Sequence, residues 1–288
     1  MIKRILARVL KKRNNSPESL IDKYCSNGRI PWSNGYIQYK EKFIDESLKS
    51  ESTINLFKSL SLPNGFGLGI DERCVEYPWI FSKISSVKER LLDAGSTFNY
   101  KHIVEQELIK QKELTIYTYY PEGNCFFQKR INYMFGDLRE LCFKDDYFDT
   151  IVSQSTIEHI DMDNSIYGYG GNEIRNEKSY EYMKAVNELV RVLKSKGKLL
   201  ITFPFGKFEN HGFFQQFDKE MLDRILDYFK NKGIVEITCF KYEKEGWRFA
   251  KQEELGEVIS FNPHTGKGKG DDGAAHCRSI ACIEFIKS

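Results

Sequence analysis

A short turn after a predicted strand carries the first groups that suit chemistry. The apolar run 90–94 contains Asp93 near its end, and Gly95 and Ser96 follow it directly. An acid at the end of a strand, followed by small residues, lets the backbone approach a bound ligand closely. Gly95 permits a sharp bend because it has no Cβ, and Asn99 is a residue type that adopts the left-handed conformation. The turn therefore predicts a site for a small ligand.

A second acid and two histidines stand beyond later strand candidates. Asp137 lies in a loop after a strand, where a carboxylate accepts a hydrogen bond from an amino group. His159 follows the strand at 148–153 and is the nearest candidate for a general base, with Glu158 beside it to orient the ring. Packing at a helix start is the alternative for this pair. His211, beyond the next strand, is a rival base.

Apolar runs and amphipathic stretches alternate from residue 87 onward. Strands are predicted at 90–94, 114–119, 148–153, 198–204, 234–241 and 279–286, and helices at 101–112, 179–194 and 216–232. Strands with helices between them need crossover connections, which indicates a mainly parallel sheet covered on both faces. Such sheets bind ligands beyond the carboxyl ends of their strands, where the strand order reverses.

The charge of the chain is nearly balanced but unevenly distributed. The 288 residues include 43 basic and 41 acidic side chains, which argues against a duplex nucleic-acid partner. Six of the basic residues lie within 1–13, where apolar residues repeat at helical spacing. A basic amphipathic helix of this kind lies on an anionic membrane or docks on a partner, and packing on its own domain is the alternative.

The cysteines and the remaining histidines predict no metal centre. The seven cysteines include no Cys-x-x-Cys pair, so neither a disulfide framework nor a zinc ribbon is expected. No ligand cluster stands at recognisable spacing, and His264 and His276 are expected at the surface of a polar C-terminal segment. No run of 18 apolar residues is present, so no membrane-spanning helix is predicted.

Four stretches between residues 87 and 206 resemble one family when they are taken together. LLDAGS, GDLREL, FDTIVSQSTIEHI and RVLKSKGKLLITFPFG, in this order, resemble the class I S-adenosylmethionine-dependent methyltransferases. GIDERCVEYPW and STIEHIDMDNSIYG are similar to stretches of the bacterial methyltransferases found with surface-polysaccharide genes. The resemblance implies a Rossmann-like doubly wound α/β fold with a seven-stranded, mostly parallel sheet and an antiparallel last strand. A helical and irregular N-terminal extension at 1–80 would precede the methyltransferase domain at 81–288.

The resemblance also implies roles for individual residues. The implied cofactor-binding residues are Asp93, Ala94, Gly95, Ser96, Asn99, Glu122, Asp137, Leu138, Ser153 and Gln154. Asp93 and Gly95 would face the methionine part and the ribose of S-adenosylmethionine, and Asp137 would bind the adenine amino group. Ser153 and Gln154 would line the pocket near the sulfonium.

Two departures from the family pattern concern the cofactor. Thr97 and Asn99 stand where the family turn usually has glycines. The second strand ends without the acid that usually holds the ribose hydroxyls, and Glu122 is the nearest substitute. These departures leave open a non-catalytic scaffold with a degenerate fold. A dinucleotide-dependent oxidoreductase is disfavoured because Gly95 stands alone, without the G-x-G-x-x-G pattern.

The predicted function is methyl transfer from S-adenosylmethionine to a hydroxyl of a small molecule or carbohydrate. Tyr167 and Tyr169 alternate with glycines in a polar loop that would suit a sugar acceptor. RNA or protein methylation is the alternative, although the chain lacks the Asn/Asp-Pro-Pro-aromatic signature of nucleobase N-methylation. The predicted location is the cytoplasm, with peripheral attachment to the inner face of the membrane through residues 1–13.

Overall fold

The computed structural model describes residues 16–165 and 177–288. The predicted basic helix at 1–13 and the loop with Tyr167 and Tyr169 lie outside the described residues. In the part of the chain that is described, no helix is both long and apolar enough to cross a membrane.

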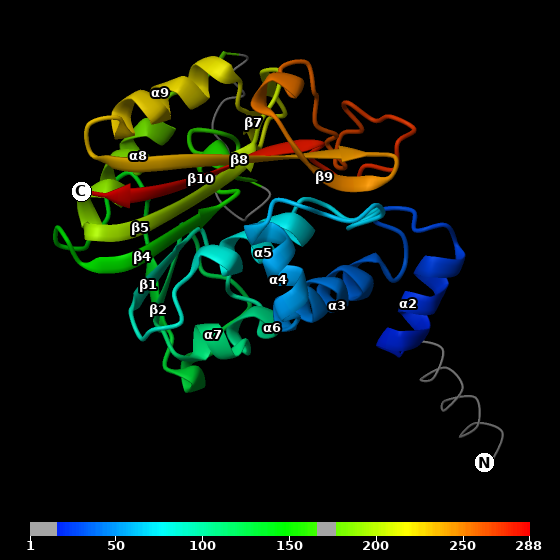
Figure 1. The fold of residues 1–288 in the computed structure, drawn as a ribbon, viewed down its shortest axis with the longest axis horizontal. Coiled ribbons are helices and arrows are strands. Elements are labelled where there is room, and N and C mark those ends of the chain that lie inside the picture. The colour runs from blue at the N-terminus through cyan, green and yellow to red at the C-terminus, as the bar shows by residue number, and fades with distance from the viewer. Residues whose placement is uncertain (1–15, 166–176) are drawn as a thin grey trace.

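An eight-stranded sheet forms the centre of the molecule, with helices on both faces (Figure 1). Its strands are β1 (Arg90–Ala94), β2 (Glu113–Thr118), β3 (Asn132–Phe135), β4 (Phe148–Gln154), β5 (Leu193–Pro204), β8 (Gly233–Glu243), β9 (Gly246–Ala250) and β10 (Ser279–Lys287). They lie in the order β3-β2-β1-β4-β5-β10-β8-β9. The last strand, β10, is antiparallel to both β5 and β8, as the predicted fold class requires.

The strand order reverses between β1 and β4. The chain runs outward from β1 to β2 and β3, and then returns to place β4 and β5 on the other side of β1. β1, β2 and β4 are parallel, so their carboxyl ends lie at one edge of the sheet. This reversal is where a ligand site is expected in a doubly wound sheet.

Successive side chains of each strand enter two different cores. Leu91 and Val152 belong to the core beneath the N-terminal helices, whereas their neighbours Leu92 and Ile151 belong to the opposite core. This alternation follows from the two-residue period of a strand. It explains why the central strands read as continuous apolar runs, since both of their faces are buried.

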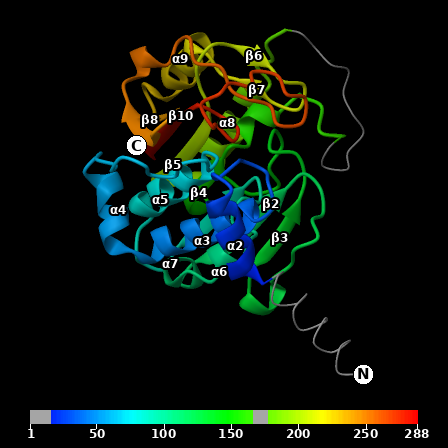
Figure 2. The same ribbon diagram turned by 90° about the vertical axis from the view of Figure 1, so that its right-hand side faces the viewer.

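Each core is covered by its own set of helices (Figure 2). One set contains α3 (Tyr36–Lys49), α4 (Glu51–Lys58), α5 (Arg73–Lys83), α6 (Lys101–Val104) and α7 (Glu107–Lys110). The other contains α8 (Tyr182–Val192) and α9 (Lys219–Phe229). α2 (Pro17–Ser26) packs beside α3 through its buried Tyr24, in a small third cluster. The described residues also include the short 3-10 helices η1 (Phe127–Lys129), η2 (Ile157–His159) and η4 (Gln252–Glu254), and β6 (Glu209–Asn210) pairs with β7 (Gln215–Gln216).

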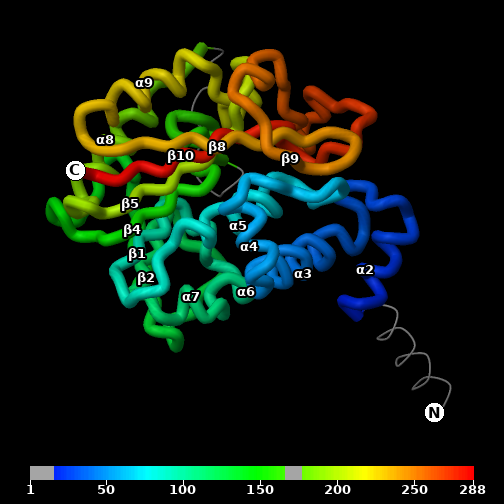
Figure 3. The backbone as a smooth tube through the Cα atoms, viewed as in Figure 1, coloured from blue at the N-terminus to red at the C-terminus, as the bar shows by residue number. Residues whose placement is uncertain are grey.

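The N-terminal helices are one layer of the domain. The predicted boundary at residue 80 falls inside α5, whose buried Trp79 and Ile80 share a core with Leu91 of β1. The chain path in Figure 3 shows this segment running directly beneath the sheet. α5 thereby brings its first residues toward the carboxyl ends of the strands, and Arg73 lines the cavity described below.

Two parts of the sequence fold differently from the prediction. The helix expected at 101–112 is broken into α6 and α7, because Gln106 has an extended backbone conformation at the residue that precedes the second helix. The sheet has eight strands where seven were predicted, because β9 forms a hairpin with β8 in a segment that reads as a polar loop.

Candidate active site

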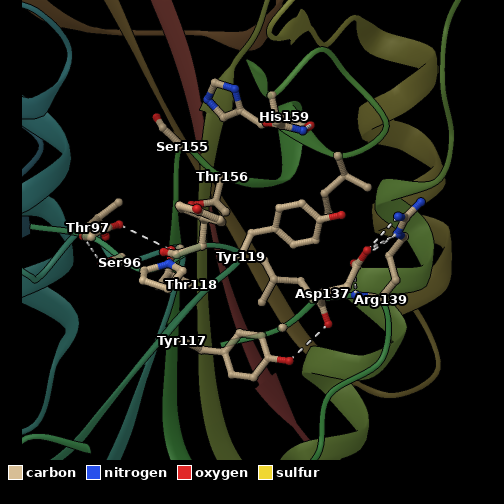
Figure 4. Close-up of a pocket in the computed structure, with 18 of the residues that line it drawn as sticks. Ser96, Thr97, Tyr117, Thr118, Tyr119, Asp137, Arg139, Ser155, Thr156 and His159 are labelled. Carbon is tan, nitrogen blue, oxygen red and sulfur yellow. Dashed lines mark hydrogen bonds and ion pairs between the residues drawn. The ribbon is translucent and has the colours of Figure 1, made fainter. Parts of the chain in front are cut away.

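A cavity of about 560 Å³ opens at the carboxyl ends of β1, β2 and β4. This volume lies within the usual range for small-molecule sites, about 300–1,000 Å³. Figure 4 shows Ser96 and Thr97 on one side, Asp137 and Arg139 on the opposite side, and His159 at one end. The predicted residues that line the cavity are Gly95, Ser96, Glu122, Asp137, Leu138 and His159.

Asp93 lies beneath the turn after β1, outside the cavity lining. Its carboxylate accepts hydrogen bonds from the backbone N–H groups of Thr97 (3.1 Å) and Phe98 (2.7 Å), and from the Thr97 hydroxyl (3.1 Å). Asp93 and Ala94 are completely buried. Burial raises the pKa of Asp93 to about 7, although the three hydrogen bonds oppose the shift. Asp93 therefore stabilises the turn, whereas the sequence-based prediction was that it contacts the cofactor directly.

Gly95 brings the turn against the chain that follows β4. Its φ is +132°, and a Cβ placed there would lie 2.0 Å from the Thr156 Oγ1 atom. The left-handed residue of the turn is Ser96, with a φ of +62°, and Asn99 does not adopt that conformation. Ser155, which also lines the cavity, has a φ of +39°. Strained backbone of this kind gathers at functional sites.

Glu122 lies beside the turn although it comes from the loop after β2. One carboxylate oxygen accepts from the Ser96 hydroxyl (2.8 Å) and from the Asn99 side-chain amide (2.9 Å). The Asn99 amide also donates to the Asn124 carbonyl (3.0 Å), so Asn99 fastens this loop to the turn. The other carboxylate oxygen accepts from the hydroxyl of Thr118, the last residue of β2 (3.3 Å), and ribose binding by Glu122 stays a prediction.

Asp137 lines the opposite side of the cavity as a carboxylate. It accepts hydrogen bonds from the side-chain and backbone nitrogens of Arg139, the shortest of them 2.6 Å. Burial alone would raise the pKa of Asp137, but Arg139 outweighs burial and lowers it. Gly136 precedes it where a Cβ would lie 2.2 Å from the Tyr117 hydroxyl oxygen. An ionised carboxylate can accept several hydrogen bonds, so Asp137 can also accept one from an amino group of a ligand.

The end of β4 presents different residues from those predicted. Ser153 and Gln154 are fully buried within the strand, and Ser155 and Thr156 line the cavity instead. The reason is that β4 continues to Gln154, whose side-chain amide donates to buried Glu76 (3.2 Å). The chain turns toward the cavity only after the strand has ended.

His159 lines the cavity and has a fixed orientation. Its Nδ1–H donates to the Phe213 carbonyl (2.7 Å), so the basic lone pair lies on Nε2. Burial lowers the pKa of His159 to about 4, which keeps the ring neutral near pH 7. The nearest Glu158 oxygen is 4.0 Å from Nε2, too far for a hydrogen bond. The Phe213 carbonyl therefore orients the ring, in the role that was predicted for Glu158.

His211 does not line the cavity. It is buried and its ring stacks on Phe214, with centroids 4.4 Å apart. Among the described residues, neither ring nitrogen of His211 has a hydrogen-bond partner. Burial lowers its pKa to about 4. The structure thus separates the rival base from the cavity.

Arg73 is a cavity residue that the sequence-based reasoning missed. It comes from α5, and its guanidinium donates to the buried Glu76 carboxylate (2.7 Å). Glu76 also accepts from the Ser155 hydroxyl (2.6 Å) and from Thr202. One buried acid therefore ties α5 to the ends of β4 and β5. The one feature of the sequence that could have indicated Arg73 was its place in the stretch GIDERCVEYPW, before β1.

Comparisons with known proteins agree with the class that this fold and cavity suggest. Residues 119–201 match the family model described as "Methyltransferase domain". This segment includes β3, η2 and most of the cavity lining beyond the first turn. The match confirms the predicted enzyme class, a methyltransferase.

Solved structures of this class are similar over most of the chain at low identity. One is a SAM-dependent methyltransferase, a possible histamine N-methyltransferase, from Thermotoga maritima, with 14% identity, a TM-score of 0.43, and coverage of 93% of this chain and 99% of that chain. Another is the N-methyltransferase NodS from Bradyrhizobium japonicum WM9 in complex with S-adenosyl-L-homocysteine, with 11% identity, a TM-score of 0.43, and coverage of 86% and 98%. No curated protein matches the chain.

The residues of the cavity fit S-adenosylmethionine. Gly95 and Gly136 both line the cavity, and at each of them the missing Cβ lets a neighbouring side chain, Thr156 or Tyr117, pack directly against the backbone. Glu122 and Asp137 supply carboxylates suited to ribose hydroxyls and to an adenine amino group. The cofactor roles of Glu122 and Asp137 stay predictions.

Proposed function

We propose that the chain methylates a hydroxyl group of a small molecule or carbohydrate. The observation that carries this proposal is His159, a neutral imidazole of fixed tautomer in the same cavity as the Gly95 turn. A hydroxyl acceptor must lose a proton as it attacks, and a base within reach of that proton assists the reaction.

Each part of the cavity has a separate task in this proposal. S-adenosylmethionine, when bound, supplies an electrophilic methyl group. The turn at Gly95 and Ser96 holds one side of the cofactor, and Glu122 and Asp137 hold its polar groups. His159 accepts the acceptor's proton at Nε2, while the Phe213 carbonyl keeps the ring from rotating. Holding both reactants in one cavity removes much of the entropic cost of their encounter.

The aromatic lining supports a sugar as the acceptor. Tyr77, Tyr100, Tyr117, Tyr119 and Tyr120 all contribute to the cavity wall. Tyrosine rings offer apolar faces for the C–H side of a sugar and hydroxyls for its polar edge. A role in surface-polysaccharide synthesis is the biological setting we propose, and a deletion strain that loses a methylated sugar would support it.

The test supplies the full-length protein with methyl-labelled S-adenosylmethionine and a panel of sugar nucleotides, glycans, RNA and peptides. We expect label only in sugar products, with mass spectrometry placing the methyl group on oxygen. His159→Ala should lose transfer while still binding S-adenosylhomocysteine, and the matched variant His211→Gln should keep the wild-type rate. Label on nitrogen, in RNA or in peptides would contradict the hydroxyl acceptor.

A further inference from the structure

Three side chains that suit a metal ion meet beside the cavity. Glu72 precedes α5, whereas His276 and Cys277 immediately precede β10, about two hundred residues later. His276 Nδ1 lies 3.2 Å from Glu72 Oε1 and 3.0 Å from Cys277 Sγ. All three potential ligand atoms lie within 4.8 Å of one another.

We propose that Glu72, His276 and Cys277 bind a Zn²⁺ ion. Thiolate, imidazole and carboxylate are the three side-chain ligands that zinc accepts, and their mixture disfavours magnesium and calcium. A thiolate sulfur and an imidazole nitrogen on one tetrahedral zinc are about 3.5 Å apart, given bonds of about 2.3 and 2.0 Å. The observed 3.0 Å needs only a small outward movement of the side chains to admit the ion.

The surroundings of these ligands are buried and rich in acid. Glu72, Glu76 and Glu158 are each at most 5% exposed, and Arg73 is the guanidinium that faces them. The Glu158 Oε2 atom has no hydrogen-bond partner among the described residues. Arg73 pairs with Glu76 (2.7 Å), and Glu72 is the carboxylate that lies beside His276 and Cys277. A metal ion held by these three side chains would be shielded from bulk water.

The proposed site borders the cavity without depending on the identity of the methyl acceptor. Arg73, the next residue after Glu72, lines the cavity. The Phe213 ring lies 5.7 Å from the His159 ring and 6.4 Å from the His276 ring, between centroids. Three protein ligands leave the fourth tetrahedral position to water, as in zinc sites that act on substrates.

The test measures metal binding without cofactor or acceptor. The full-length protein is stripped with a chelator and titrated with Co²⁺ and Zn²⁺. We expect one equivalent of either metal per chain, a thiolate-to-cobalt charge-transfer band in the near ultraviolet, and a higher Tm with Zn²⁺. Cys277→Ser should abolish the band, and Glu72→Gln should weaken Zn²⁺ binding by about 100-fold or more.

Two control variants make the result specific. Cys25→Ser and Cys142→Ser remove exposed cysteines and should leave the cobalt band and the Zn²⁺ affinity unchanged. If wild-type protein takes up no cobalt, or shows a band that survives Cys277→Ser, the cluster is only an ion pair with a thiol beside it. That result would leave the methyltransferase function untouched, because cofactor binding is measured separately.

Discussion

Replacing Gly95 with alanine should damage both the stability of the protein and its cofactor site. Alanine would have to adopt a φ of +132°, which costs about 1–3 kcal/mol. Its Cβ would also lie 2.0 Å from Thr156 Oγ1 and 2.6 Å from Thr156 Cγ2, and overpacking of this kind costs about 1–3 kcal/mol more. Taken together, we expect a loss of about 4 kcal/mol, or a fall in Tm of about 8–16 °C.

Gly95→Ala should also weaken the affinity of the protein for the cofactor. The turn holds Ser96, whose hydroxyl donates to Glu122 (2.8 Å), so relief of the clash would separate the two sides of the cofactor site. Calorimetry with S-adenosylhomocysteine should show a Kd at least about tenfold weaker, equivalent to about 1.4 kcal/mol. Thermal and denaturant unfolding would measure the stability loss in the same preparations.

Two further variants separate the causes. Gly123→Ala changes another glycine of the cavity lining, where a Cβ would meet no atom within 4 Å, and should resemble the wild type. Adding Thr156→Gly to Gly95→Ala removes the side chain that causes the clash, so about half of the loss should return while the strain at φ remains. If Gly95→Ala melts and binds S-adenosylhomocysteine as the wild type does, the close approach of this turn is not what shapes the site.

Three other predictions concern single side chains. Activity should be constant above about pH 5 and fall as the pH decreases through about 4. The reason is that burial lowers the pKa of His159, and only the neutral ring accepts a proton. A pH–rate profile that falls near pH 6.5 would contradict this assignment of the base. Glu122→Gln should keep the fold and weaken S-adenosylhomocysteine binding by about tenfold, because an amide would lose the charge-assisted hydrogen bonds that we predict Glu122 makes to the ribose. Titration calorimetry would measure this loss. Lys112→Met should lower the free energy of unfolding by about 3–5 kcal/mol, because it removes a fully buried ammonium 2.9 Å from Glu89 and leaves that carboxylate unpaired. Denaturant unfolding would measure this loss. As a control, Lys110→Met breaks an exposed ion pair with Glu107 and should change the free energy of unfolding by less than about 1 kcal/mol.

The central strands could be predicted because their apolar runs are short and uninterrupted. β1 begins and ends at the predicted residues, and β10 differs by one residue at its end. A strand was expected before Asp137, but its bounds could not be predicted because β3 has only four residues, none of them fully buried. β9 was missed because its pairing with β8 depends on a turn within a polar stretch, and such a contact leaves no periodic pattern.

The site was only partly predictable, because the residue at which each strand ends decides which side chains face the cavity, and the sequence does not fix that residue. His159 and Gly95 were found from their positions after strands, and both line the cavity. Asp93 was also found, but its carboxylate accepts hydrogen bonds from the backbone N–H groups of its own turn and does not line the cavity. Arg73 was missed as a cavity residue because it comes from a helix that precedes the sheet in the chain.

The sequence by itself determined the alternating pattern of strands and helices, the glycine turn after β1 and the presence of a histidine beyond β4. These are local properties, since they depend on the period of apolar residues and on what a missing Cβ permits. Only the tertiary structure decided that Glu122 stands beside Ser96, that the Phe213 carbonyl orients His159, and that Glu72 meets Cys277. Each of these contacts joins segments far apart in the chain, and packing of the whole sheet and its helices fixes their distances.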